Sequence, residues 1–494
     1  MSNFWGAYHF RLPFIAPVLL KNAEYRLKYN SIHVIITVYI IMECAKMNAE
    51  NKMAYRPINK LILQMSAPPL ISMFLQYSYN LVDSMFVAKI NEQSLAAVSL
   101  SFPITTLMNA LSIWIGVGVN VLIAGYLGQN KQKKADSAAT LGLLLSLSVG
   151  VAVTIATLFI IKPYYATFTQ NNEIFKYGLR YMKICAYMQI PNMVHIAIQK
   201  MLQATGNMIA PMWFQIIGVM FNFIFDPLLI FGVGPFPEMG IAGAALATVL
   251  GYTLSMLIAL IQLFFTKQKV KPILKGYRFD AQILKMLISY GLPSFIMNAL
   301  GSFMVNFVNV FLVNYSDTAV AFFGAYFKVQ QLIVMTVNGL IQGCLPIMRF
   351  NYRAKKEARL WQTYKIGTLF ATIMMFVGTF LVMCFPDEIL SLFSASQEMR
   401  LLGITAMRIM SLGFVFSGLS TMIATYKQAT DKVVPSIIIQ LCRQGVLLIP
   451  LMWLLNHTLQ IIGIWIAFPI TELLVCVFAC LLMQKERKNI HTTK

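Results

Sequence analysis

A succession of long apolar segments constrains what this chain can fold into. Lipid offers no water to the backbone, so each segment that crosses a membrane bonds within itself as a helix. At about 1.5 Å per residue, a helix of about 20 residues spans a hydrocarbon core of about 30 Å. Hydrophobic residues make up 58% of the 494 residues and charged residues 12%, which favours an all-α polytopic membrane protein. Twelve transmembrane helices are expected at about 58–90, 96–127, 137–161, 174–203, 209–233, 240–266, 281–313, 319–348, 359–384, 399–427, 433–455 and 460–483.

The basic residues between these segments indicate orientation. They gather in alternate loops, whereas loops 232–239, 314–319 and 456–459 contain no Lys or Arg. Loops rich in Lys and Arg stay in the cytoplasm, so both termini are expected inside, as an even helix count also requires. Because membrane orientation accounts for the basic loops, the net charge of +21 does not indicate a nucleic-acid partner.

The chain also repeats itself. Ser66-Ala67-Pro68 recurs as Gly291-Leu292-Pro293 and Gln203-Ala204-Thr205 as Gln428-Ala429-Thr430, each 225 residues later. An offset of 223 or 224 relates Pro211 to Pro435, Pro227 to Pro450 and Gly240 to Gly463. Six helices separate the copies, which predicts two pseudo-symmetric six-helix lobes, 57–270 and 271–484, followed by a cytoplasmic tail, 485–494. Two such lobes facing a central cleft are typical of transporters.

Residues 1–56 fit this pattern poorly and are assigned to an N-terminal extension. Their apolar run, 32–42, is too short to cross a membrane as a helix, and no signal peptide is evident. Either the native start lies later, at Met47 or Met53, or the segment is a peripheral amphipathic arm.

A group of polar residues is predicted to share one depth in the first lobe. Asp83, Asp226 and Thr248 each lie seven or eight residues from the outer end of a helix, hence about 10–12 Å below the outer surface. Asn222 lies one turn deeper than Asp226 on the same face. Two carboxylates, an amide oxygen and a hydroxyl could bind a bare cation or carry a proton. Alternatively, Asp83 pairs with a lysine and Asp226 caps the chain near Pro227.

Several strings resemble the multidrug and toxic-compound extrusion (MATE) family, in particular its bacterial branch of DinF and MepA types. They are Tyr79-Asn80-Leu81-Val82-Asp83, Asn222-Phe223-Ile224-Phe225-Asp226-Pro227, the segment 240–248, and Cys442-Arg443-Gln444 before Ile449-Pro450. The resemblance covers about 57–484. It implies that Asp83, Asn222, Asp226 and Thr248 contribute to a cation site in the N-terminal lobe.

The second lobe lacks a matching pair of acids and carries intramembrane cations instead. Arg443 and Glu472 both fall near the membrane midplane, where an unpaired charge is costly, so a pair or shared network is expected. Lys328, Arg408 and Lys183, the repeat partner of Arg408, are assigned to the same charge network. Either packing between helices or a role in substrate binding or coupling would explain them.

His195 stands alone among apolar residues and is expected to be a hydrogen-bonded core histidine, with a proton relay as the alternative. The seven cysteines show no CxxC pair, so no metal site is predicted.

Together these features predict a secondary active efflux transporter in the bacterial cytoplasmic membrane. It would export amphipathic, often cationic, small molecules in antiport with protons or sodium, as a monomer in the lipid bilayer and without a cofactor. Pro68 is a candidate hinge in the first helix. The alternative is a flippase for a lipid-linked saccharide, from a related branch of the superfamily. No Walker, HExxH or GxSxG motif is present, which argues against ATP as the direct driver and against an enzyme.

Overall fold

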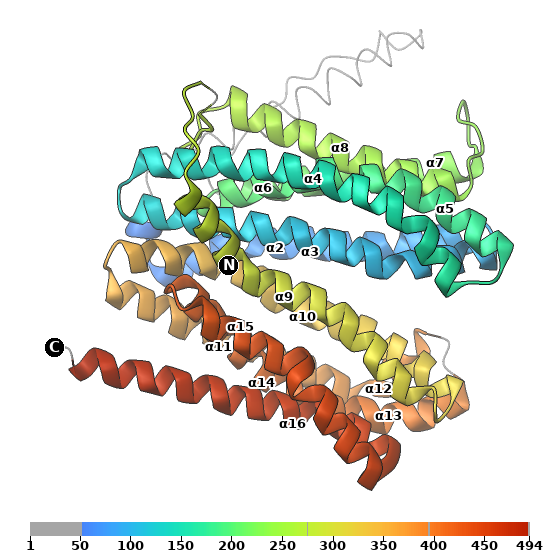
Figure 1. Ribbon diagram of the computed structural model, residues 1–494. Helices are drawn as coiled ribbons and strands as arrows, with labels where there is room; N and C mark the ends of the chain where they lie inside the picture. Colours follow the sequence, from blue (N-terminus) through green and yellow to red (C-terminus); the bar gives the residue numbers. More distant parts are fainter. Residues whose placement is uncertain (1–51, 274, 394–395, 493–494) are drawn as a thin grey trace, which may run out of the picture. The chain divides into compact units, whose positions relative to one another are not determined.

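The computed structural model describes residues 52–492 apart from 274 and 394–395 (Figure 1). The described part of the chain is helical and contains no strand. The predicted extension lies outside the described residues up to residue 51. Its last residues, 52–56, are described.

All twelve predicted segments are helical. The first half contains α2 (Ile58–Ala88), α3 (Glu92–Gly128), α4 (Gln132–Phe168), α5 (Asn172–Tyr187), α6 (Gln189–Ala204), α7 (Ile209–Phe231) and α8 (Ile241–Phe265). The second half contains α9 (Ala281–Leu312), α10 (Asp317–Arg353), α11 (Glu357–Cys384), the short α12 (Pro386–Ser391), α13 (Gln397–Ser411), α14 (Gly413–Ala429), α15 (Val433–Leu441), the π-helix η2 (Cys442–Val446) and α16 (Leu448–Thr492).

Nine helical stretches of the described chain are long and apolar enough to cross a membrane. One of them, 433–484, contains two crossings, because α16 breaks at Gln460, where φ is 49°. The remaining two crossings are α2 and the pair α5–α6, which carry more polar residues. The twelve predicted crossings are therefore all present.

The backbone repeats between the two halves, as the sequence predicts. The fourth crossing is broken at Met188, between α5 and α6, and the tenth at Leu412, between α13 and α14. Both residues have φ near −58° and ψ near −26° and lie 224 residues apart. Left-handed residues also recur at an offset of 225, since Asn130 matches Lys355 and Gly206 matches Asp431.

The residues just before α2 are part of the folded unit, which corrects the predicted boundary at residue 57. A turn of 3-10 helix, η1 (Lys52–Ala54), precedes α2, and the Met53 side chain is fully buried. The Met53 carbonyl accepts hydrogen bonds from Asn351 Nδ2 at 3.3 Å and from Arg359 Nη2 at 3.1 Å. Apolar packing and these two bonds to the second half hold the segment in place.

The two halves meet where α2 and α3 pack against α9 and α10 (Figure 1). We call the helix ends that carry the basic loops the basic side. On the basic half of these helices, Ser66 Oγ donates to the Leu340 carbonyl at 3.3 Å and Trp114 Nε1 to the Ile288 carbonyl at 2.8 Å. Glycine permits the close approach of the backbones, since a Cβ on Gly118 would lie 2.2 Å from the Leu287 oxygen.

Candidate functional site

Asp83 of α2 and Asp226 of α7 meet inside the first half, as the depth argument predicts. Their carboxyl groups lie close enough to interact with each other. Asp226 is fully buried and Asp83 is half-buried. Oδ1 of each carboxyl group is buried and has no hydrogen-bond partner among the described residues. The alternative in which Asp83 pairs with a lysine is therefore not what the structure shows.

Tyr79 completes this site, and the sequence analysis missed its role. Its hydroxyl donates to Asp226 Oδ2 at 2.9 Å and also lies in hydrogen-bonding contact with Thr248 of α8. Tyr79 precedes Asp83 by four residues, so both side chains share one face of α2. That spacing was visible in the sequence and could have identified the tyrosine.

Asn222 and Thr248 lie in the same region, but their side-chain contacts differ from those predicted. The Asn222 side chain is buried against Gly251 of α8, where a Cβ would lie 2.1 Å from the amide oxygen. That oxygen has no hydrogen-bond partner among the described residues. Thr248 Oγ1 donates to the Ala244 carbonyl of its own helix at 3.0 Å. The pair of acids and Tyr79 therefore form the centre of the site, with Asn222 at its edge.

The chemistry of the pair follows from its geometry. Two ionised carboxylates have no proton to donate to each other and repel, so their proximity favours a proton on one of them. Burial in a membrane-spanning bundle makes a doubly charged pair costly. The site can therefore hold a proton and exchange it. Among the described residues, no group of three or more His, Cys, Asp or Glu side chains could hold a metal ion.

The predicted hinge lies in α2 within its contact with the second half, because Ser66 and Leu70 on either side of it pack against α10. Pro68 is followed by Pro69, and both lie inside the continuous helix. Neither has a backbone N–H, so two helical hydrogen bonds are missing in succession. The Ser72 hydroxyl donates to the Pro69 carbonyl at 3.0 Å.

Arg443 and Glu472 form the predicted ion pair in the second half. Arg443 Nε lies 2.7 Å from Glu472 Oε1, and both side chains are largely buried. The guanidinium also donates to Thr421 Oγ1 at 2.5 Å and to the Ser417 hydroxyl. Arg443 lies on the π-helix η2, a local widening that often occurs at functional positions.

The other three cations do not join this network, which corrects the prediction. Lys183 and Lys328 are exposed, and Arg408, also exposed, donates to the Met383 carbonyl at 3.3 Å. Helix periodicity explains the difference, because depth along a helix does not determine which face a side chain occupies. His195 also differs from its expectation, since both ring nitrogens are buried and have no hydrogen-bond partner among the described residues.

A buried lysine that the sequence analysis did not single out lies between the two halves. Lys200 of α6 is 8% exposed. Its Nζ donates to Gln203 Oε1 at 3.0 Å and to Gln342 Oε1 of α10 at 2.8 Å. Both acceptors are neutral amides, and no ion pair joins Lys200 to an acid among the described residues.

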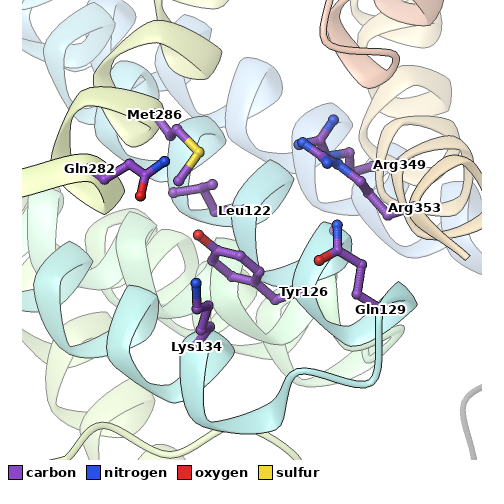
Figure 2. A pocket seen from close by; sticks show the side chains of 9 residues that line it. Leu122, Tyr126, Gln129, Lys134, Gln282, Met286, Arg349 and Arg353 are labelled. Carbon is purple, nitrogen blue, oxygen red and sulfur yellow. The ribbon is translucent and has the colours of Figure 1, made fainter. Parts of the chain in front are cut away.

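A cavity of about 150 Å³ opens on the basic side between the halves (Figure 2). It is lined by Leu122, Gly125, Tyr126, Gln129, Lys134, Gln282, Met286, Arg349 and Arg353. Behind it, the loop residue Asp431 forms ion pairs with Arg349 at 2.7 Å and Arg353 at 3.0 Å and accepts from the Tyr290 hydroxyl. Burial alone would raise the pKa of Asp431, but the two arginines and the tyrosine outweigh burial and hold that pKa below its usual value.

Known proteins similar to this chain are membrane transporters. An FAD transporter of Shewanella oneidensis is 25% identical over 442 residues, which cover 88% of this chain and 97% of that protein. The multidrug export protein MepA of Staphylococcus haemolyticus is 24% identical over 434 residues, covering 87% and 94%. A solved structure of a multidrug resistance MATE family transporter in an outward-facing conformation superposes with a TM-score of 0.85 at 24% identity, covering 90% of this chain and 100% of that one.

The MatE family model matches the chain twice, over residues 68–228 and 293–454. The two matches begin 225 residues apart, the offset that relates the two halves in sequence and backbone. The halves are thus the two six-helix lobes of one fold. With one family unit in each lobe, the chain belongs to the MatE family and is a multi-pass membrane transporter of the MepA-like type, not an enzyme.

Proposed function

We propose that this transporter exports amphipathic compounds in antiport with a cation that enters through the Asp83–Asp226 site. The coupling ion is a proton or sodium, and the contact between the two carboxyl groups favours the proton. In this proposal the basic side faces the cytoplasm, and one copy of the chain is sufficient for transport. Its relatives include a multidrug export protein and an FAD transporter, so similarity alone does not determine its substrate class.

The observation that carries the proposal is the contact between Asp83 and Asp226. Removing the shared proton leaves two negative charges side by side in a buried place. The two carboxylates then move apart or take up another proton, so the geometry of the site depends on whether a proton is bound. A site of this kind can convert a proton gradient into a preference for one arrangement of the lobes.

Helix α2 offers a path from this site to the lobe contact. Tyr79 and Asp83 lie on its outer half, and Ser66, which bonds to Leu340 of the other lobe, lies on its basic half. Pro68 and Pro69 lie between them and lack two helical hydrogen bonds. A change in protonation at Asp83 would alter the bend of α2 at the prolines and so loosen or tighten the contact with α10.

The test is transport by purified protein in proteoliposomes, with a proton gradient and a sodium gradient imposed separately. Asp83→Asn and Asp226→Asn keep the size of the side chain but remove the charge, so each is expected to reduce gradient-driven efflux at least tenfold at equal abundance. Tyr79→Phe removes one hydrogen bond to the pair, so a reduction of a few-fold is expected. Glu173→Gln is the control, because that acid is exposed at the start of α5.

The outcomes separate the parts of the proposal. Transport driven by sodium alone would replace the proton as the coupling ion. Unchanged efflux in Asp83→Asn would show that coupling occurs elsewhere. Light scattering in detergent checks the number of copies, with one expected.

A further inference from the structure

We propose that the transported compounds are organic anions, bound along the lobe boundary by Lys328 and Lys200. This proposal rests on the proposed efflux function and specifies its substrate class. It revises the expectation that the compounds are often cationic.

Lys328 faces the boundary between the lobes. On the basic half of α10, Gly339 and Gly343 pack against Leu70 and Ser66 of α2, in the other lobe. Lys328 precedes Gly339 by eleven residues, which is three helical turns, so the two lie on the same face of α10. Lys328 therefore lies on the face of α10 that contacts the other lobe, three turns closer to the outer end of the helix.

The opposite face of α10 confirms this direction. Phe322, Phe323 and Tyr326 are fully buried within the second lobe, where Phe322 contacts Trp465 and Phe323 contacts Phe468. Lys328 is about half a turn away from these rings around the helix axis and is exposed. An ammonium facing lipid about 16 Å along a crossing helix would be costly, whereas a water-filled boundary between the lobes accommodates it.

Lys200 supplies a second cation deeper on the same boundary. Its Nζ bridges the lobes through Gln342, and both of its acceptors are neutral amides. Further toward the basic side, the cavity of Figure 2 adds Lys134, Arg349 and Arg353, of which the two arginines share Asp431. The lobe boundary is thus lined by cations on its outer half, on its basic half and at its basic opening.

Carboxylates that could attract a cationic compound are already engaged. Away from the helix ends, the described crossing helices contain three acids, Asp83, Asp226 and Glu472. The first two contact each other inside the first lobe, and Glu472 is paired with Arg443 inside the second. A cationic compound on the boundary would meet basic side chains, whereas a phosphate or carboxylate would favour their protonated form and gain charge-assisted hydrogen bonds from it.

The same boundary offers apolar and aromatic surface. Phe74 on the outer half of α2 is 54% exposed, and Leu332, one turn from Lys328 on α10, is 47% exposed. Phe74 follows Leu70, a contact residue of α10, by one turn, so it lies on the boundary face of α2. The surface therefore fits an amphipathic molecule with an aromatic ring and an acidic group.

The experiment compares three aromatic probes in energised inverted membrane vesicles. FAD carries phosphates, riboflavin has the same ring without them, and ethidium is an aromatic cation. The variants are Lys328→Gln, Lys328→Glu and Lys328→Arg, with Lys365→Gln on α11 as a control, because Lys365 is exposed but lies over the Trp361 ring and not on α10.

We expect the wild type to take up FAD in preference to ethidium. Lys328→Gln should weaken the apparent affinity for FAD about tenfold, as for one lost charge-assisted hydrogen bond, with less effect on riboflavin. Lys328→Arg and Lys365→Gln should retain FAD uptake, and Lys328→Glu should abolish it while raising ethidium uptake.

The assignment of anions would be overturned if the wild type takes up ethidium but not FAD and if Lys328→Gln takes up ethidium equally well. The efflux function would remain intact. Equal loss of all probes in Lys328→Gln and Lys328→Arg would show a structural role for the lysine and would also overturn the assignment of anions. Failure of the wild type to move any probe would contradict the proposed function itself, and with it this inference.

Discussion

At the scale of single residues, ion pairs and hydrogen bonds hold several charged side chains in place between helices. Asp431 is the clearest case outside the membrane-spanning segments, since it is held by Arg349, Arg353 and Tyr290. Its left-handed backbone, with φ of 64°, places the carboxylate between helices of the second lobe. Aspartate and asparagine tolerate this conformation better than most residues.

Asp431→Asn tests this contribution through pH. The pKa of Asp431 is lowered in the folded protein, so its stabilising effect is present above the unfolded value of about 3.9 and is lost as pH falls through the folded value. We expect the variant to be less stable by about 1.5–3 kcal/mol at pH 7, the range for hydrogen bonds to charged groups, and the difference to shrink as the pH falls toward 3. Thermal unfolding in detergent from pH 7 to pH 3 measures the difference. A constant difference across this range would contradict the assignment.

The Arg443–Glu472 pair makes a second residue-scale prediction. Removing one partner leaves an unpaired charge in the bundle, so Arg443→Met or Glu472→Gln is expected to cost roughly 3–5 kcal/mol. The double variant should lose less than the sum of the single variants, because no charge remains unpaired. A double-mutant cycle of unfolding free energies provides the check, and additive effects would indicate that the two side chains act independently.

At the scale of helices, the contact between α3 and α9 depends on residues without side chains. A Cβ on Gly118 would lie 2.2 Å from the Leu287 carbonyl oxygen, which is backbone and cannot turn aside. Gly118→Ala is therefore expected to separate the basic ends of the lobes and to raise the population of the conformation open to that side. Spin-label distances between the basic ends of α3 and α9 measure this shift.

Gly301→Ala on α9 is the matched control, because its Cβ would make an ordinary contact at 3.9 Å. If both variants keep the wild-type distances, the close approach at Gly118 does not control the arrangement of the lobes.

The segment before α2 makes a prediction about a short element. Met53 is buried, and its carbonyl is bonded by Asn351 and Arg359. A chain that starts at Met47 is expected to keep wild-type stability in detergent, whereas one that starts at Pro57 should be less stable by about 2–3 kcal/mol, since a hydrogen bond to a charged group and packing are lost. Equal thermal stability of the two chains would show that η1 contributes nothing.

At the scale of the whole molecule, the distribution of charge predicts a fixed orientation. Single cysteines at Asn130 and Gly276, in basic loops, should react with an impermeant maleimide in inverted vesicles. Single cysteines at Gly234 and Asn314, in loops without Lys or Arg, should react in whole cells. Native cysteines are replaced beforehand. Labelling of both loop classes from one side would contradict the twelve-crossing topology.

The sequence predicted the crossings, the repeat and both charge pairs for physical reasons. Apolar length and loop charge depend on the membrane as a solvent, and a buried charge needs a partner, so each is readable without coordinates. Rotation about a helix axis is not readable in the same way, because lipid-facing and boundary-facing positions are equally apolar. That is why Lys328 was assigned to a network and why Lys200 was missed.

Helix breaks were also not predicted. Pro191 removes the donor for the Tyr187 carbonyl and so explains the end of α5. No proline marks the equivalent break at Leu412, where only the repeat could have identified it.

The matched left-handed residues and helix breaks show that positions in one lobe have structural equivalents, or twins, about 225 residues away in the other. Corresponding positions share their geometry but not always their chemical character. Asp83 corresponds to Val308, which is fully buried and apolar. The molecule thus resembles a duplicated part in which one copy carries a charge and the other shares only the shape. Each lobe therefore serves as an internal reference for the other: a substitution that matters only for shape should act alike at both twins, and one that matters for chemistry should act at one.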